Sequence, residues 1–307
     1  MQPAVSIFLK TLRDVRWQIV WYGGGFALMA AMVVYLYPSY SSQMKGMELP
    51  DAVKALLGGA DYTSPSGFIG AEVFSWAPAV LAIFGIMAGT SMLAGEETNG
   101  TVDLLLSQPV SRTTLMLAKL AGVFAATVAI AAVIYVGFLL SVPFVAEMDI
   151  GYGELALATL NLALVMSFFA AFSACAGAYL RSRGAATGLA VALAVASYFV
   201  NYLGELVDVI RPLRYVSVMH YNGGAAAITE GIDVAGAALL IALTGLCVVL
   251  GLRAFNQRDL SAGAGMALPS LAFRHRRILL AAGQRAIAGP IEQTHSTDRQ
   301  NGARSRL

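Results

Sequence analysis

The segment "LAGVFAATVAIAAVIYVGFLLSVPFVA", Leu120–Ala146, has 27 consecutive residues without a charged side chain. A helix that rises about 1.5 Å per residue needs roughly 20 such residues to cross the hydrocarbon core of a bilayer. Five more uncharged apolar runs follow the same pattern: Ile19–Pro38, Val73–Gly95, Leu155–Leu180, Gly184–Gly204 and Val234–Leu252. These runs are apolar throughout, whereas the strands of a membrane barrel alternate apolar and polar residues. The sequence therefore predicts an all-α integral membrane protein with six transmembrane helices.

The composition of the whole chain supports this class. Hydrophobic residues make up 58% of the 307 residues and charged residues 12%. A soluble globular domain has about 45–50% apolar residues, glycine included, and about 25% charged ones. The two cysteines, Cys175 and Cys247, lie singly inside predicted spans, so neither a disulfide framework nor a metal site is expected.

Basic residues predict the orientation of the chain. Of its 20 lysines and arginines, 16 lie before the first span, in the loops after the second and fourth spans, or after the sixth. Segments rich in Lys and Arg stay in the cytoplasm according to the positive-inside rule. We therefore expect a multi-pass protein of the cell membrane (plasma or inner membrane), with both termini in the cytoplasm.

Three segments outside the six spans carry further predictions. Residues 3–18 place apolar side chains at helical spacing opposite charged ones, which predicts an N-terminal interfacial amphipathic helix. Residues 205–233 are too polar to span a membrane and too apolar for a free linker, so we expect short helices packed at the outer rim. Residues 1–253 thus form the membrane domain, and residues 254–307 form a basic cytoplasmic tail that is partly disordered.

The sequence lacks the residues of several kinds of active site. A phosphate-binding loop needs Gly-Lys followed by Ser or Thr, and none of the four lysines follows a glycine. No acidic or basic residue lies within the six runs, although carboxylates inside the membrane are typical of proteins that move protons or ions. We therefore expect no catalytic residue, no metal or cofactor of the chain's own and no nucleic-acid partner, with the energy for any transport coming from elsewhere.

The loop between the second and third runs combines charge with three consecutive leucines. It reads "GEETNGTVDLLLSQPVSRTTLMLAK", residues 95–119, and includes Leu104, Leu105 and Leu106. Thr101 can cap a short helix with Asp103 in its first turn, and Pro109 ends that helix. Ser111 or Thr113 can then cap the next long helix. Because the three leucines are about 100° apart, they cannot all face one membrane surface; they favour docking to a soluble subunit, or else the loop folds under its own helices.

The same stretch resembles the loop between spans two and three of type-2 ATP-binding-cassette (ABC) permeases, six-span membrane subunits that work with a separate ATPase. The matching residues are Glu97, Gly100, Thr101, Asp103, Leu105, Leu106, Pro109, Val110, Arg112 and Lys119. The layout also matches over nearly the whole chain: an amphipathic N-terminal helix, six spans and a long segment before the sixth. The basic tail after Arg253 is longer than this pattern requires.

The resemblance implies a short coupling helix that docks on a cytoplasmic ABC ATPase subunit, which would hold ATP and Mg²⁺. The implied coupling residues are Glu97, Gly100, Thr101, Asp103, Leu104, Leu105, Leu106, Pro109 and Arg112. It also implies a dimer with a second permease chain, identical or similar, whose spans two and five line the substrate path of an exporter. The corresponding path residues are Phe84, Met87, Ser91, Tyr198, Asn201 and Tyr202. The alternatives are a membrane module for assembly or sensing and an exporter driven by an ion gradient.

Two pairs of glycines at four-residue spacing predict close helix contacts in the membrane. Gly85 and Gly89 lie in the second run, and Gly184 and Gly188 lie in the fifth. The spacing fits contacts with a neighbouring helix of the same chain or with a partner chain, and contacts within the chain are favoured.

Overall fold

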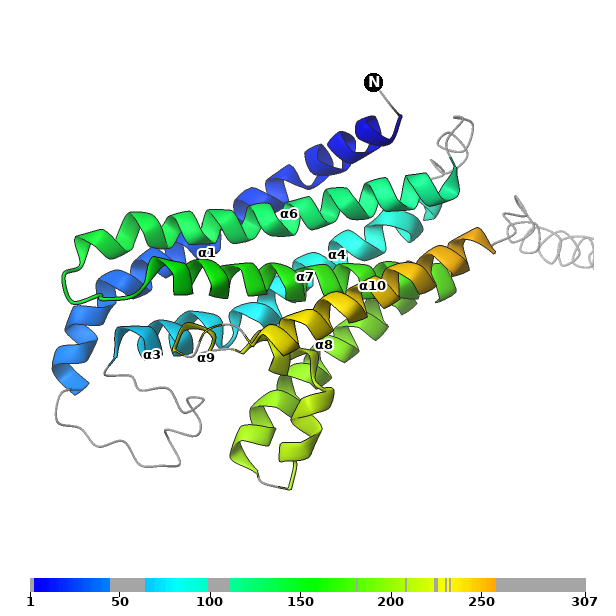
Figure 1. Ribbon diagram of the computed structural model, residues 1–307. Coiled ribbons are helices and arrows are strands. Elements are labelled where there is room, and N and C mark those ends of the chain that lie inside the picture. Colours follow the sequence, from blue (N-terminus) through cyan, green and yellow to red (C-terminus); the bar gives the residue numbers. More distant parts are fainter. Residues whose placement is uncertain are drawn as a thin grey trace, which may run out of the picture. The chain divides into compact units, whose positions relative to one another are not determined.

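The computed structural model describes residues 3–44, 64–98, 111–180, 182–207, 209–223, 226–229, 231 and 233–257. These residues form helices, turns and connecting segments, and they include no strand. Six helices are long (Figure 1): α1 (Pro3–Met44), α4 (Ala77–Thr98), α6 (Arg112–Ser141), α7 (Tyr152–Leu180), α8 (Arg183–Leu206) and α10 (Val234–Asn256). The described chain has six candidate membrane spans built on these helices. The predictions of an all-α protein and of six spans are confirmed.

Helix α1 joins two elements that the sequence separates. The predicted interfacial helix, residues 3–18, and the first run, Ile19–Pro38, belong to one continuous helix of 42 residues. Such a helix is about 63 Å long at 1.5 Å per residue, about twice the thickness of a hydrocarbon core. Part of α1 therefore extends beyond that layer or lies along its surface, and the interfacial position of residues 3–18 stays a prediction.

The second span begins earlier than the sequence predicts. Two short elements precede α4: α3 (Pro65–Ile69) and the π-helix η1 (Gly70–Phe74). With them the candidate span covers Pro65–Met92, whereas the apolar run starts only at Val73. The Ser64 side chain accepts a hydrogen bond from the Gly67 N–H at 3.1 Å, and Pro65 suits the first position of a helix. This capped start lies before Glu72, so the candidate span includes a glutamate that the charge-free run leaves out.

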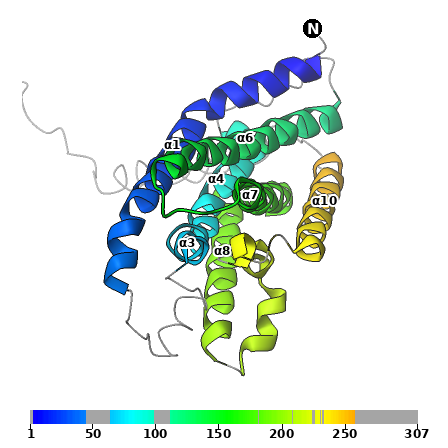
Figure 2. The same ribbon diagram turned by 60° about the vertical axis from the view of Figure 1, so that its left-hand side comes forward.

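Helix α7 occupies the centre of the bundle and contacts α4, α6, α8 and α10 (Figure 2). Helix α1 packs mainly along α6. One hydrophobic core draws most of its residues from α1, α4, α6 and α7, and a second draws on α4, α7, α8 and α10. Four short elements complete the described chain: η2 (Val142–Phe144), η3 (Arg211–Val216), η4 (Val218–Asn222) and α9 (Ala226–Thr229).

The two glycine pairs have different surroundings. A Cβ atom on Gly85 would collide with the carbonyl oxygen of Met166, and one on Gly89 would collide with that of Ala170. These glycines therefore bring α4 against α7, and the predicted contact within the chain is confirmed. A Cβ atom on Gly188 would meet nothing within 4 Å, and one on Gly184 would meet only the Ser182 hydroxyl at 4.0 Å. Among the described residues, no other helix contacts Gly184 or Gly188, so the prediction of a contact within the chain is wrong for this second pair.

Capping side chains fix the starts of three long helices. Ser111 accepts a hydrogen bond from the Thr114 N–H at 3.1 Å and starts α6, which confirms one of the two predicted caps. Ser182 caps α8 through the Ala185 N–H at 3.3 Å, and Asp233 caps α10. Each cap satisfies a backbone N–H that has no partner within its own helix.

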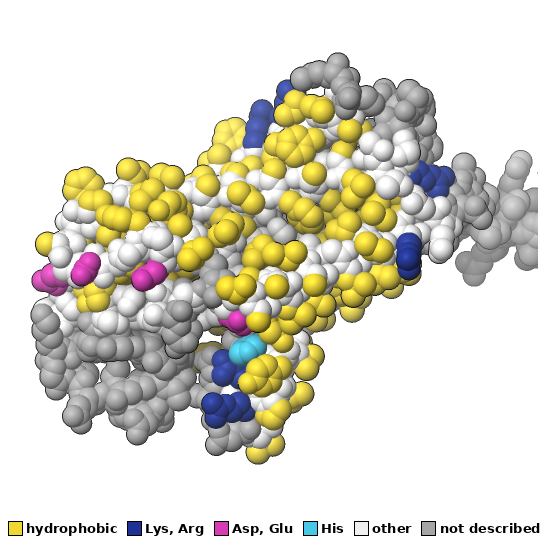
Figure 3. Space-filling model, viewed as in Figure 1, with side chains coloured by type: hydrophobic (Ala, Val, Ile, Leu, Met, Phe, Trp, Pro, Cys, Tyr) yellow, Lys and Arg dark blue, Asp and Glu magenta, His cyan; other side chains and the backbone are white. Residues whose placement is uncertain are grey.

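Charged side chains gather at the ends of the long helices, and hydrophobic side chains cover most of the surface between them (Figure 3). The starts of α6 and α8 and the last turn of α10 carry basic residues: Arg112, Arg183 and Arg253. The opposite ends of α6 and α7 carry acidic ones: Glu147, Asp149 and Glu154. This asymmetry agrees with the predicted orientation, which stays a prediction.

Candidate functional site

The predicted coupling residues lie between the end of α4 and the start of α6. Glu97 belongs to the last turn of α4, and Arg112 is the first residue of α6. Outside the described residues lie the other predicted coupling positions: Gly100, Thr101, Asp103, Leu104, Leu105, Leu106 and Pro109. The two helices that border this segment are tied together by Lys119 of α6, whose Nζ donates a hydrogen bond to the Met92 carbonyl of α4 at 3.1 Å.

The predicted path residues of α4 have two different environments. Phe84 is completely buried, and its ring meets that of Tyr22 on α1 edge to face, with centroids 5.8 Å apart. Met87, by contrast, is 45% exposed. Ser91 is partly exposed, and its hydroxyl donates to the Ala88 carbonyl at 2.9 Å. Met87 and Ser91 thus lie at the surface of the chain, whereas Phe84 packs α4 against α1.

Met87 and Ser91 belong to a narrow strip of α4, which we call the α4 strip. Its members are spaced by four residues: Ala79, Ile83, Met87 and Ser91. Apart from Val80, the other residues from Ala77 to Met92 are buried. A helix that is buried on every side but one offers a single line of side chains to a partner, to lipid or to a substrate.

The neighbours of α4 locate this strip. Gly85 faces α7, Ala82 and Ile86 share a core with Ala190 and Ala194 of α8, and Phe84 faces α1. Side chains follow one another at about 100° around a helix. The α4 strip therefore falls between the side that contacts α8 and the side that contacts α1.

Helix α8 turns an apolar face away from the bundle. Ala190 and Ala194 are buried toward α4 and α7. Large side chains elsewhere on α8 are at least 40% exposed: Leu189, Val191, Val195, Phe199 and Leu203. The glycines Gly184 and Gly188 are exposed as well. A second helix can approach this face closely, because small residues let backbones come together in a membrane.

The predicted path residues of α8 lie near its last turns and are all partly exposed. The rings of Tyr198 and Tyr202 stack with their centroids 6.3 Å apart. Asn201 Oδ1 accepts a hydrogen bond from Arg214 Nε at 3.5 Å, which connects α8 to η3. Helix α8 runs antiparallel to α4, so these three residues lie toward the end of the bundle opposite Ser91. The structure does not bring the six predicted path residues together at one point.

The chain after α8 folds back along the bundle through η3 and η4, and we call residues 211–222 the folded-back segment. The Ser217 hydroxyl donates to the Ser197 carbonyl of α8 at 2.6 Å. Asn161 Nδ2 of α7 donates to the carbonyls of Tyr221 and Asn222 at 3.3 and 2.8 Å. Asn161 lies nine residues from the start of α7, so η4 reaches about 13 Å past that helix end. The predicted short helices are confirmed as η3, η4 and α9, and their position at the outer rim stays a prediction. Asn161 is the one amide inside the fourth apolar run, and it connects η4 to α7.

One histidine in this folded-back segment has a perturbed pKa. The His220 ring lies against those of Tyr215 and Tyr221, with centroids 5.2 and 5.3 Å away. Burial lowers the pKa of His220 below its ordinary value of 6.5, the Arg214 charge lowers it further, and the Asp233 charge acts in the opposite direction. Within the described ranges, no three His, Cys, Asp or Glu side chains come together in a group that could hold a metal ion.

Comparison with protein families adds one finding to this geometry. A family model described as "ABC-2 family transporter protein" matches residues 6–260 of the 307. Apart from the first three residues of α1, the matched region contains all six long helices and the segment between α4 and α6. No curated protein matches the chain.

Proposed function

This chain belongs to the ABC-2 transporter family, and we propose that this type-2 ABC permease forms the substrate path of an ATP-driven exporter as a dimer. A separate cytoplasmic ATPase subunit would bind ATP and Mg²⁺ and drive the movement. Permeases of this family are membrane components of transporters and not enzymes themselves. The partner permease would be a second copy of this chain or a similar chain, and both termini would lie in the cytoplasm.

The observation that carries the dimer is the α4 strip between α1 and α8. If two chains pack through the exposed faces beside these helices, the two α4 strips lie opposite each other. Ile83 and Met87 would then form walls of the path, with Ser91 toward the end where α4 finishes. The exposed glycines of α8 support this arrangement, because Gly184 and Gly188 leave room for a helix of the partner chain.

Cysteine crosslinking tests this dimer. In a background that lacks Cys175 and Cys247, Gly188→Cys places a thiol on the exposed face of α8. Leu246→Cys is the matched control, because Leu246 is 52% exposed on α10, away from the proposed interface. Oxidation in native membranes should give the Gly188→Cys variant a band at twice 32.2 kDa and should leave the control monomeric. Equal crosslinking of both variants would show random collision and would contradict the interface.

The coupling proposal rests on the position of the leucines between α4 and α6. Force on residues 99–110 would pass into both helices, which the Lys119–Met92 hydrogen bond holds together. Replacing Leu105 and Leu106 with Asp removes apolar contacts worth about 1.5–3 kcal/mol each when buried. We expect this double variant to weaken ATPase binding roughly a hundredfold or more.

The measurement is retention of the ATPase subunit when the full chain is purified from mild detergent. The control is Leu246→Asp on α10, which changes an exposed leucine far from the loop in sequence; since this variant puts a charge on an apolar face, its insertion is checked separately. If the loop variant holds its ATPase as firmly as the unaltered chain, the loop only braces its own helices. If the unaltered chain holds no ATPase at all, a role in assembly or sensing, or transport driven by an ion gradient, replaces the ABC mechanism.

A further inference from the structure

Helices α1 and α6 run parallel with a constant register, which fixes the depth of each residue of α1. A Cβ atom on Gly122 would meet the Thr11 side chain at 2.8 Å, and one on Gly137 would meet Ala27 at 2.7 Å. The positions in these two pairs differ by 111 and 110 residues. Each residue of α1 in this region is therefore level with the residue of α6 that comes about 110 positions later.

This register places two arginines of α1 beside the apolar part of α6. The charge-free run of α6 begins at Leu120. Arg13 and Arg16 are level with positions three and six residues further along α6, which is about 5 and 9 Å past that start. Both arginines are exposed. An exposed guanidinium at this depth avoids the hydrocarbon only if its long side chain bends back to the lipid headgroups.

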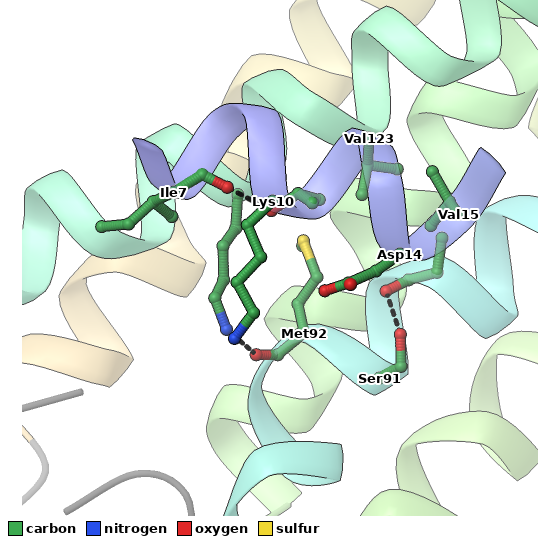
Figure 4. A pocket seen from close by; sticks show the side chains of 10 residues that line it. Ile7, Lys10, Asp14, Val15, Ser91, Met92 and Val123 are labelled. Carbon is green, nitrogen blue, oxygen red and sulfur yellow. Dashed lines mark hydrogen bonds between the residues drawn. The ribbon is translucent and has the colours of Figure 1, made fainter. Parts of the chain in front are cut away.

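The two arginines lie on a different side of α1 from the residues that face α4. Lys10 and Asp14 border a cavity of about 90 Å³ that α1, α4 and α6 line, and Figure 4 shows both side chains on the side of α1 that faces Met92. Side chains follow one another at about 100° around a helix. Arg13 and Arg16 therefore point about 100° and 160° away from Asp14. They face away from α4, whose exposed strip carries the proposed dimer.

Arg13 and Arg16 can bind one anion together. Residues three apart on a helix are neighbours, with Cβ atoms about 5–6 Å apart. The guanidinium carbon of Arg16 lies 5.9 Å from the centre of the Trp17 ring, a distance at which the face of an aromatic ring attracts a cation. Guanidinium groups bind phosphate oxygens through paired N–H donors. The two arginines thus offer a phosphate site beside an aromatic ring.

The neighbours of this pair indicate a lipid rather than a soluble anion. Trp17 and Trp21 are 63% and 74% exposed, and Val20, one turn beyond Arg16, is 55% exposed. Exposed tryptophans are typical of the boundary between headgroups and acyl chains. A lipid phosphate at the arginines would place its acyl chains along Val20 and the two rings. We propose that Arg13 and Arg16 bind the phosphate of an anionic phospholipid in the leaflet at the N-terminal end of α1.

Lipid titration of the full chain tests this site. The protein is delipidated in detergent and titrated with phosphatidylglycerol or phosphatidylcholine, and bound lipids are counted by native mass spectrometry. We expect a firmly held phosphatidylglycerol and a roughly tenfold preference over phosphatidylcholine, whose own quaternary ammonium group competes with the arginines for the phosphate. Replacing both arginines, Arg13→Gln with Arg16→Gln, should weaken this binding by about fivefold for each.

The matched control is Lys10→Gln, because Lys10 is an exposed cation of the same helix that borders the cavity instead. All three side chains are exposed, so these variants should fold. The control should bind phosphatidylglycerol as firmly as the unaltered chain. A loss of binding as large as that of the arginine variant would mean general attraction to a charged surface and would overturn the site.

Three further outcomes would assign this face of α1 to something else. Displacement of the lipid by millimolar inorganic phosphate would identify a site for a soluble anion. Equal affinity for the two lipids would show that the arginines do not select an anionic headgroup. If the arginine variant has a smaller dimer fraction but unchanged lipid binding, a second copy of the chain covers this face. Each of these results would overturn the lipid proposal.

Discussion

Helices α4 and α8 share an apolar composition and a glycine spacing, but their surroundings differ. Each is apolar, and each contains a pair of glycines four residues apart. In α4 the glycines face backbone atoms of α7, and from Ala77 to Met92 the α4 strip and Val80 are the only residues that are not buried. In α8 the glycines face open space, and most large side chains are exposed. The same spacing therefore marks an internal contact in one helix and an unoccupied surface in the other.

The largest effect should come from filling the α4 contact. Gly89→Leu would drive a side chain into the Ala170 carbonyl and the Ser173 side chain. Overpacking of this kind costs about 1–3 kcal/mol, and more where backbone atoms cannot move. We expect a large loss of folded protein and a lower midpoint of thermal unfolding in detergent. Gly188→Leu is the control. If it lowers the unfolding midpoint as much as Gly89→Leu does, the crowding of Gly89 by α7 does not explain the loss of stability.

The second prediction concerns the folded-back segment that lies beside α8. Asn161→Leu removes the hydrogen bonds to two carbonyls of η4, the part-buried one of Tyr221 and the buried one of Asn222. Leaving such groups without partners costs about 1–3 kcal/mol. Hydrogen exchange of residues 217–222 should therefore speed up. Asn256→Leu is the control, since the hydrogen bond of Asn256 to Thr113 is exposed. If hydrogen exchange of residues 217–222 is faster in both variants, Asn161 does not hold η4 specifically.

The third prediction uses the exposed glycines of α8. Gly188→Leu should leave the fold of the single chain intact, because no atom lies within 4 Å of the added Cβ. If a partner helix packs there, the bulkier side chain should weaken the dimer about tenfold, which corresponds to about 1.4 kcal/mol. The dimer fraction is measured by light scattering across a dilution series. An unchanged dimer would place the interface elsewhere.

The sequence predicts the parts of this molecule that depend on local pattern. Charge-free length predicts six spans, and Ser111 is a recognisable helix cap. Pattern alone does not reveal which neighbour each helix has. Gly85 and Gly184 look alike in sequence, and their environments differ only because α7 passes one of them. Phe84 and Met87 are likewise three residues apart in one apolar run, yet one is core and the other is surface.

A cavity that is lined by residues of α1, α4 and α6 shows the same limit. Lys10 and Asp14 lie one helical turn apart on α1, and Lys119 is far from both in sequence. They border one space because α1 packs along α6 and the end of α4 lies between them. Such a cavity depends on the packing of three helices, and no short motif encodes it. The coupling residues are the opposite case, since their motif is local and their docking partner is another protein.

The smallest expected effect is a pH dependence of stability that comes from His220, which lies in the folded-back segment beside the last turns of α8. Its pKa in the folded chain is below 6.5, mainly because burial disfavours the charged ring. Between that lowered pKa and 6.5 the unfolded chain binds more protons, so stability is complete above pH 6.5 and decreases as the pH falls through this window. The midpoint of thermal unfolding should therefore fall more steeply from pH 7 to pH 5 in the unaltered chain than in His220→Gln. Parallel slopes in the two proteins would show that protonation of His220 does not loosen the segment beside α8.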